Sequence, residues 1–246
     1  MTWSDPYGLT PLDWVALAYF LIMWLAYAPF VQWRGRRVQM LNSAMIDHRR
    51  AWMEAQLGRE VKVADTVIVG HIMSTAGFFA STTVIVIAAL LGVLFNLGLA
   101  TRPDAGGVWS IATPTPLEIK LILILVVAAY AFQSFTWSIR QANFAAVLMG
   151  AAPPPSMDEA FLQRIAISMG NIITGTAQSY DNGMRAYYFA LGAVTWVVSP
   201  IVFMIATTGV VALLLHRQTR SRTALALREI AIARSEACVL NKETAA

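Results

Sequence analysis

Four long runs of apolar residues divide the sequence, and each is long enough to cross a lipid bilayer. A hydrocarbon core of about 30 Å needs roughly 20 apolar residues in a helix. The runs cover residues 14–33, 66–100, 121–138 and 186–215. They are apolar on most faces, whereas the strands of a membrane barrel alternate over about 10 residues. The pattern therefore predicts four membrane-spanning helices.

The second and third runs predict helices that are longer than the bilayer is thick. Residues 66–100 would form about 50 Å of helix at 1.5 Å per residue. The first part of this run is its most polar part, so we expect the helix to enter the bilayer near residues 74–77. The third helix is expected to continue to Met149, because Gly150 and the prolines at 153–155 then stop it.

Two further segments carry a one-sided apolar stripe and predict interfacial helices. The first covers residues 40–57, and the second covers residues 161–180. Ser156 and Glu159 fit a capping box at the start of the second helix. Such stripes are typical of helices that lie on a membrane or on other helices. The expected fold is an all-α integral membrane protein, a bundle of about four transmembrane helices plus interfacial amphipathic helices.

The composition agrees with a membrane protein. The chain is 57% hydrophobic and 13% charged, whereas soluble domains average about 45–50% apolar and about 25% charged residues. This argues against an ordinary cytosolic enzyme and a disordered chain. The net charge of +4 is too small for a polycationic surface, so no nucleic acid is expected as a partner. A single cysteine, Cys238, excludes an internal disulfide framework and a thiolate metal cluster.

The basic residues predict an orientation but leave the number of spans open. Residues 34–65 hold seven basic residues, and the N-terminal tail holds none. Because basic residues prefer the cytoplasm, the N-terminus is expected outside and this connector inside a cell inner (cytoplasmic) membrane. With four spans, the basic tail after Arg217 would lie outside; a fifth span over residues 161–180 would return it to the cytoplasm. The amphipathic stripe favours four spans, and the tail favours five.

Two clusters of polar residues form the candidate binding site. The first lies at the end of the third helix, and the second lies at the start of the fourth run. The candidate residues are Gln133, Trp137, Arg140, Gln141, Asn143, Asn182, Arg185 and Tyr188. Amide and guanidinium donors beside aromatic rings can bind an anion, a lipid headgroup or a polar solute. The same residue types also serve as interface anchors and as amides that tie helices together.

Small residues in the second helix predict close helix packing. Gly70 and Ser74, and likewise Gly77 and Ser81, are spaced so that another helix can approach closely. A hydroxyl-lined path is the alternative. His71 lies in the same run, but no second histidine is placed to form a haem pair with it, so a packing or interfacial role is expected.

Several kinds of chemistry have no counterpart in the sequence. The four runs contain no Asp or Glu, which a proton-coupled transporter usually needs. No nucleotide-binding loop, zinc-protease motif or plausible nucleophile triad is present. We therefore expect no enzyme activity, no cofactor and no metal.

Three segments carry a resemblance to a known family. They are Phe-Phe-Ala-Ser-Thr-Thr at 78–83, Ile-Arg-Gln-Ala-Asn-Phe at 139–144 with Gly-Ala-Ala-Pro at 150–153, and Asn-Gly-Met-Arg-Ala-Tyr-Tyr-Phe-Ala-Leu at 182–191. The chain resembles domain-of-unknown-function family 599, helical membrane proteins of bacteria and plants, over residues 13–217. The resemblance implies about four membrane helices and brings no known activity. It also implies that certain residues belong to the shared pattern: Arg140, Gln141, Asn143, Asn182 and Arg185.

Two functional hypotheses follow. The first is a non-enzymatic integral membrane protein, oligomeric, that binds or passes a small polar or anionic species near the cytoplasmic face. The second is a structural or accessory subunit of a larger membrane complex. The expected partners are the lipid bilayer and either further copies of the chain or other membrane subunits. Residues 1–217 are expected to form the membrane domain and residues 218–246 a basic C-terminal tail.

Overall fold

The computed structural model describes residues 8–35, 41–59, 62–101 and 115–219, together with residues 226, 229 and 230. Within these ranges the protein is all-helical, which confirms the predicted fold class. The elements are α1 (Pro11–Gly35), α2 (Leu41–Leu57), α3 (Val63–Thr101), α4 (Pro116–Gly150), α5 (Glu159–Val194), the 3-10 turn η1 (Thr195–Val197) and α6 (Pro200–Thr219). Arg36, Arg37, Cys238 and most of the tail predicted at 218–246 lie outside the described residues.

Four helices are long and apolar enough to cross a membrane, as predicted. These segments are Pro11–Val31, Val63–Gly98, Pro116–Gly150 and Pro200–Thr219. The first three correspond to the first three apolar runs, and α4 ends at Gly150 as expected. The amphipathic helix expected over residues 40–57 is α2.

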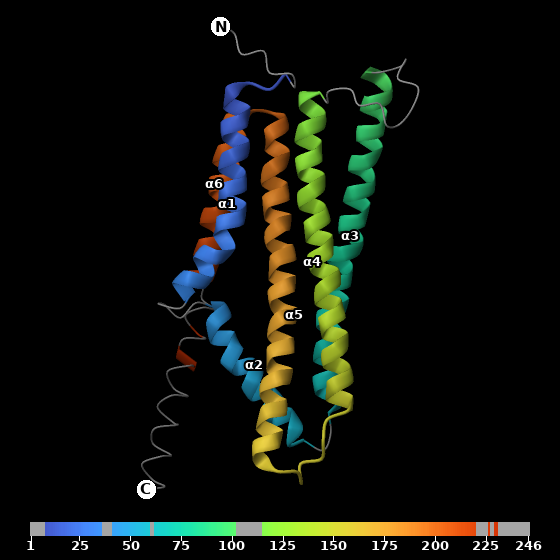
Figure 1. Ribbon diagram of the computed structural model, residues 1–246, viewed down its shortest axis with the longest axis vertical. Helices are drawn as coiled ribbons and strands as arrows, with labels where there is room; N and C mark the ends of the chain where they lie inside the picture. The colour runs from blue at the N-terminus through green and yellow to red at the C-terminus, as the bar shows by residue number, and fades with distance from the viewer. Residues whose placement is uncertain are drawn as a thin grey trace.

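The helices form one elongated bundle in which α2 occupies only the lower half (Figure 1). The helices α1, α3, α4, α5 and α6 run through the upper half of this view. α1 and α6 end near the middle, and α2 packs on α5 below them. α5 packs against α2, α4, η1 and α6, with α4 as its most extensive neighbour.

The fourth apolar run was wrongly predicted as one helix. The structure divides residues 186–215 between the end of α5 and α6, with a sharp turn at Ser199 and Pro200. Pro200 begins α6, because a proline at the first helical position sacrifices no hydrogen bond. The Ser199 hydroxyl oxygen accepts a hydrogen bond from the Ile201 backbone N–H at 3.3 Å. The two halves of the run thus form neighbouring antiparallel segments.

The amphipathic helix expected at 161–180 is part of this longer α5. Its predicted capping box is also wrong, because the N-cap is Asp158 and not Ser156. The Asp158 carboxylate accepts a hydrogen bond from the Phe161 N–H at 3.1 Å. From this start α5 runs without interruption from the lower end of the bundle to the upper end (Figure 1).

Two buried clusters hold the bundle together. The upper one is aromatic: the Phe20 ring lies 5.0 Å from Phe203 and 5.7 Å from Phe189, and Trp196 stacks on Phe203 at 5.1 Å. The lower one is aliphatic and methionine-rich. Its members are Met53, Leu57, Val69, Ala142, Ala145, Met149, Ala166, Met169 and Ile173. Because α4 and α5 contribute to both clusters, they join the two halves of the bundle.

α1 and α4 begin with the same short sequence at the upper end of the bundle. Thr-Pro-Leu-Asp opens α1 at residues 10–13, and Thr-Pro-Leu-Glu opens α4 at residues 115–118. In each, the threonine and the acid form reciprocal hydrogen bonds with the other residue's backbone N–H. This is a capping box with proline at the first helical position, and it fixes where both helices start.

Candidate functional site

The first predicted cluster lies mostly on the exposed outer face of α4. Gln133, Trp137, Arg140 and Asn143 are all exposed. The Arg140 guanidinium lies 5.7 Å from the ring centres of both Trp137 and Phe144. Asn143 donates its side-chain N–H to the Ile139 carbonyl of its own helix at 3.2 Å. This strip offers stacked aromatic and cationic groups to the surroundings rather than an enclosed site.

Gln141 points away from this strip and joins α4 to α5. Its side-chain oxygen accepts a hydrogen bond from the Ser179 hydroxyl at 2.9 Å. A Cβ added at Gly175 would lie 3.1 Å from the Gln141 amide nitrogen, so the two helices approach closely here. One turn earlier, Ser138 donates to the Thr176 carbonyl at 2.8 Å. Gln141 therefore belongs to the helix–helix interface.

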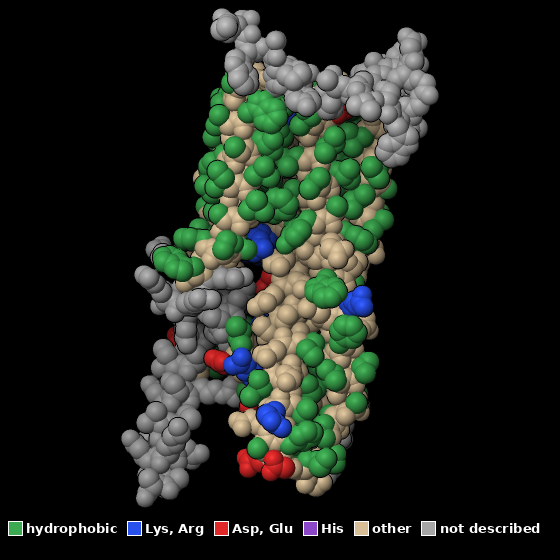
Figure 2. Space-filling view, viewed as in Figure 1, with side chains coloured by type: hydrophobic (Ala, Val, Ile, Leu, Met, Phe, Trp, Pro, Cys, Tyr) green, Lys and Arg blue, Asp and Glu red, His purple; other side chains and the backbone are tan. Residues whose placement is uncertain are grey.

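The second predicted cluster lies where α1, α5 and α6 meet. Arg185 donates a hydrogen bond to the Asn182 side-chain oxygen at 2.9 Å, and its guanidinium lies 5.5 Å from the centre of the Tyr27 ring. Tyr188 accepts a hydrogen bond from Arg217 at 2.6 Å, and the same guanidinium lies 5.8 Å from the Tyr188 ring centre. We call Tyr27, Asn182 and Arg185 the Arg185 cluster. Figure 2 shows a recess beside the lower end of α1, with basic and acidic side chains at its edge.

Two buried donors of the Arg185 cluster have no hydrogen-bond partner among the described residues. They are the Tyr27 hydroxyl and the Arg185 Nε. Tyr27 is only 5% exposed. Leaving a buried polar group unsatisfied costs about 1–3 kcal/mol, and buried polar groups in native proteins nearly always have a partner. The cluster is therefore suited to an acceptor that could take both hydrogen bonds.

Further charges lie around this cluster. Burial lowers the pKa of the Arg49 guanidinium on α2, and the nearby Asp181 carboxylate offsets part of that effect. Asp181 also interacts electrostatically with the Tyr27 hydroxyl, as does Arg185. Asp181 thus interacts with two different groups, the Tyr27 hydroxyl of the Arg185 cluster and the Arg49 guanidinium of α2.

The small residues predicted for helix packing lie on a face of α3 that does not contact α4. Gly70, Ser74 and Ser81 are exposed, and Gly77 is half-buried. A Cβ at Gly70 or Gly77 would meet nothing within 4 Å. α3 instead turns a different set of residues inward: Val69, Ala76, Ala80 and Thr83. His71 is also exposed.

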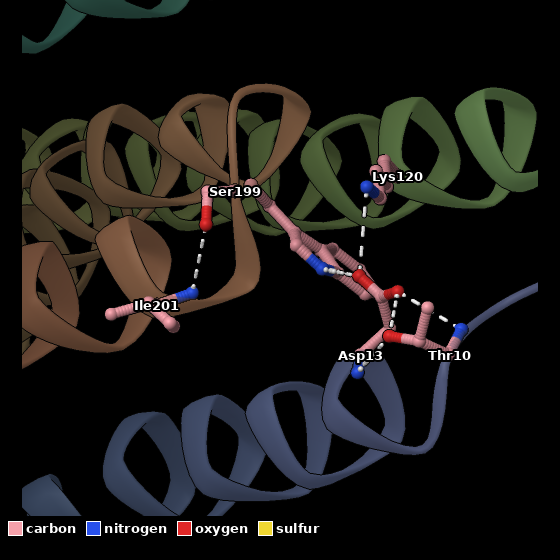
Figure 3. Close-up of polar contacts among 6 residues, drawn as sticks. Thr10, Asp13, Lys120, Ser199 and Ile201 are labelled. Atoms are coloured by element: carbon pink, nitrogen blue, oxygen red, sulfur yellow. Dashed lines mark hydrogen bonds and ion pairs between the residues drawn. The ribbon is translucent and has the colours of Figure 1, made fainter.

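A closed polar network lies at the upper end of the bundle (Figure 3). The Asp13 carboxylate accepts hydrogen bonds from the Trp196 indole N–H at 2.8 Å and from the Thr10 hydroxyl at 2.7 Å. The Lys120 ammonium lies 3.5 Å from the same carboxylate. Both carboxylate oxygens are thus occupied, so this network joins α1, α4 and η1 instead of offering a binding site.

Sequence reasoning missed Tyr27 as a member of the Arg185 cluster, Asp181 and Arg49 as charged groups nearby, and Arg217 as the partner of Tyr188. Each comes from a different helix or lies beside a predicted residue, so their proximity depends on tertiary packing. Tyr27 carries the one available signal, a polar hydroxyl near the end of an otherwise apolar run. Among the described residues, no group of three or more His, Cys, Asp or Glu could hold a metal ion.

Fold and hydropathy together define an all-helical membrane protein. A family model, Protein of unknown function, DUF599, matches residues 15–223. Because this match covers most of the sequence, the chain belongs to the DUF599 family, as the sequence resemblance predicted. No curated protein and no solved structure matches the chain.

Proposed function

We propose that this protein binds or passes a small anionic or polar species at the Arg185 cluster, without catalysing a reaction. The observation that carries the proposal is the pair of buried donors, the Tyr27 hydroxyl and the Arg185 Nε, which lack an acceptor among the described residues. Both groups donate, so the partner that they fit is an oxygen-bearing anion. A carboxylate or phosphate matches a guanidinium well, because two of its oxygens can accept parallel hydrogen bonds.

The depth of Arg185 supports this proposal. Trp196 and Asp13 mark the upper end of the bundle, and Arg185 lies about 16 Å below Trp196 at 1.5 Å per helical residue. In a hydrocarbon layer of about 30 Å, this depth falls inside the layer, past its middle. Ionisable residues at such depths are costly, and they usually mark a substrate or ion path.

The course of α5 supports an orientation in which the lower end of the bundle, where α2 lies, faces the cytoplasm. α5 passes from the lower end to the upper end beside the four apolar helices, which gives five passages (Figure 1). The end of α6 at Arg217 then lies on the same side as α2. Both basic regions of the chain are thereby on one side, as the preference of basic residues for the cytoplasm requires. An inner membrane location with an internal C-terminus is part of the proposal.

The matched variants Arg185→Gln and Arg140→Gln test the proposed binding site. Arg140 is exposed on α4 and stacks on Trp137, so its loss removes an equal charge outside the cluster. Thermal unfolding of the purified protein is measured with increasing sodium acetate or phosphate, against sodium chloride, whose anion has no oxygen acceptors, at equal ionic strength. A ligand at 100 times its Kd stabilises the folded state by about 2.7 kcal/mol. We expect this stabilisation in wild type and Arg140→Gln but not in Arg185→Gln.

Proteoliposomes then separate binding from passage. Vesicles loaded with acetate or phosphate are diluted into sodium chloride, and efflux is compared between the same three proteins. Efflux that depends on Arg185 supports passage, and binding without efflux restricts the proposal to a binding protein. Equal acetate or phosphate stabilisation in all three proteins would contradict the assignment of the site.

An accessory role in a larger membrane complex is the second candidate function, and the surface of α3 favours it. Its exposed small residues leave open space, and such a face lets another helix approach closely. Large apolar side chains are also exposed at the lower end of the bundle, including Val67 and Val147. Native mass spectrometry after gentle extraction distinguishes the two roles: a stoichiometric foreign subunit supports the accessory role, and a homo-oligomer does not.

A further inference from the structure

The helices α2 and α3 are joined at their lower ends and separate above. The Asp65 carboxylate at the start of α3 accepts hydrogen bonds from the Trp52 indole at 2.6 Å and from the Arg59 guanidinium at 2.7 Å. Asp65 is buried, so this contact fixes the junction firmly. Above it, α2 packs against α5 while α3 packs against α4 (Figure 1). The two helices thus diverge, and residues of α5 border the space between them.

The divergence leaves a cavity of about 410 Å³ between α2, α3 and α5. Met45 and Trp52 line it from α2, Ile68 and Ile72 from α3, and Ile173 from α5. These side chains are apolar, and the surface that they present is suited to hydrocarbon. Arg49 of α2 is the charged residue among those that line the cavity.

An apolar cavity with one arginine among its lining residues has a specific chemical complement. A hydrocarbon chain is stabilised when it leaves water for the apolar walls, and an anionic headgroup offers the half-buried Arg49 a charge-assisted hydrogen bond. A purely apolar ligand would leave the guanidinium without that partner, and a small anion would leave the apolar walls empty. The Asp181 carboxylate, which interacts with Arg49 from α5, lies outside the set of residues that line the cavity.

We propose that this cavity binds a single-chain anionic amphiphile, a fatty-acid-like carboxylate whose headgroup pairs with Arg49 and whose chain lies between α2, α3 and α5. This site is separate from the Arg185 cluster and goes beyond the function proposed above. Its ligand is larger and largely apolar, and it would hold α2 and α3 apart at a fixed separation.

Native mass spectrometry with dodecanoate as the probe tests this site. The protein is kept in a short-chain non-ionic detergent, and adducts are counted while the dodecanoate concentration is raised. We expect one dodecanoate per chain. Acetate, which has the headgroup without the chain, and dodecyltrimethylammonium, which has the chain with the opposite charge, should each bind at least tenfold more weakly.

Two variants probe the chain and the headgroup separately. Ala177→Trp fills the cavity and should abolish the adduct, while Val67→Trp, at a position 64% exposed and outside the lining, should retain it. Arg49→Gln should weaken binding at least tenfold, and Arg49→Lys should restore most of it. Because Arg49→Gln leaves the apolar walls intact, it keeps the test decisive if Ala177→Trp does not fold.

Three results would overturn the inference. One is equal binding of dodecanoate and dodecyltrimethylammonium, which would show that charge plays no part. Another is an undiminished adduct in folded Ala177→Trp. The third is loss of the adduct in Arg185→Gln, which would place the headgroup at the Arg185 cluster instead of at Arg49. Acetate or phosphate stabilisation through Arg185 is a separate measurement, so each proposal can fail without the other.

Discussion

Trp196 donates its indole N–H to the Asp13 carboxylate across 2.8 Å, which joins residues 183 positions apart in the sequence. The same carboxylate caps α1 through Thr10 and faces the Lys120 ammonium of α4 at 3.5 Å. One buried acid therefore connects the starts of α1 and α4 to the turn between α5 and α6. This arrangement closes the upper end of the bundle.

Removing the Asp13 carboxylate should destabilise the protein. Asp13→Ala leaves the largely buried Lys120 without its counter-charge and the Trp196 indole without its acceptor. Breaking such a pair by deleting one partner costs about 3–5 kcal/mol when it is fully buried, and we expect about 3 kcal/mol here. Chemical unfolding in detergent measures this change. The matched variant Asp47→Ala, at an exposed position on α2, should stay within about 0.5 kcal/mol of wild type.

Gly183 should tolerate no larger residue unless Phe135 changes with it. A Cβ at Gly183 would lie 2.6 Å from the Phe135 ring, which is fully buried and cannot easily move. Overpacking of this kind costs about 1–3 kcal/mol, so Gly183→Ala should lower the free energy of unfolding by that amount. Combining it with Phe135→Leu should recover part of the loss. No recovery in the double variant would contradict this explanation.

Gly77→Ala is the contrasting substitution on α3. Nothing lies within 4 Å of a Cβ at this position. Within the single chain the change should therefore be neutral or stabilise the helix by up to about 1 kcal/mol. If this face packs against another subunit, the bulkier Gly77→Leu should shift the mass distribution toward the isolated chain. An unchanged distribution for Gly77→Leu would contradict the use of this face in assembly.

Tyr27→Phe should separate ligand binding from stability. The Tyr27 hydroxyl is buried and lacks a partner among the described residues, so its removal should leave the ligand-free stability unchanged or raise it by about 1 kcal/mol. The same variant should lose much of the stabilisation by acetate or phosphate. Tyr19→Phe, on the same helix, is the control. It removes an exposed hydroxyl that bonds Thr208 at 2.8 Å, and it should retain the stabilisation.

The proposed five passages predict which positions can be labelled from outside the cell. In a Cys238→Ser background, Val198→Cys lies in the turn between α5 and α6 and is 80% exposed in wild type. It should react with a membrane-impermeant thiol reagent on intact cells. Ser156→Cys, between α4 and α5, should react only after permeabilisation. The native Cys238 should also need permeabilisation; its labelling on intact cells would instead indicate four passages.

Hydropathy was sufficient for the helices that present apolar residues on most faces. α1, α3 and α4 correspond to uninterrupted apolar runs. The end of α4 at Gly150 is signalled by neighbouring residues in the sequence, so it too could be predicted. α5 could not be identified in this way, because Asp181 and Arg185 lower its hydropathy where it passes beside the apolar helices. Conversely, the apolar run at 186–215 hides a turn whose only signal is Ser199 followed by Pro200.

The candidate site was only partly accessible to sequence reasoning, because helical spacing cannot tell which neighbour a face meets. Spacing grouped Arg140 with Gln141, but one stacks on Trp137 at the surface and the other bonds Ser179 of α5. Asn182 and Arg185 are neighbours along one helix, so their contact could be predicted. Tyr27 is brought to them from α1 by long-range packing, which no local pattern encodes.

The Phe135 ring at Gly183 has a consequence for motion. A side chain seated in a notch that small opposes both sliding and rotation of α5 along α4. α4 and α5 therefore keep a fixed position relative to each other, and displacements are expected in the other helices. Any opening that admits a solute to Arg185 must come from displacement of α1 or α6, and any entry between α2 and α3 from a swing about the Asp65 junction.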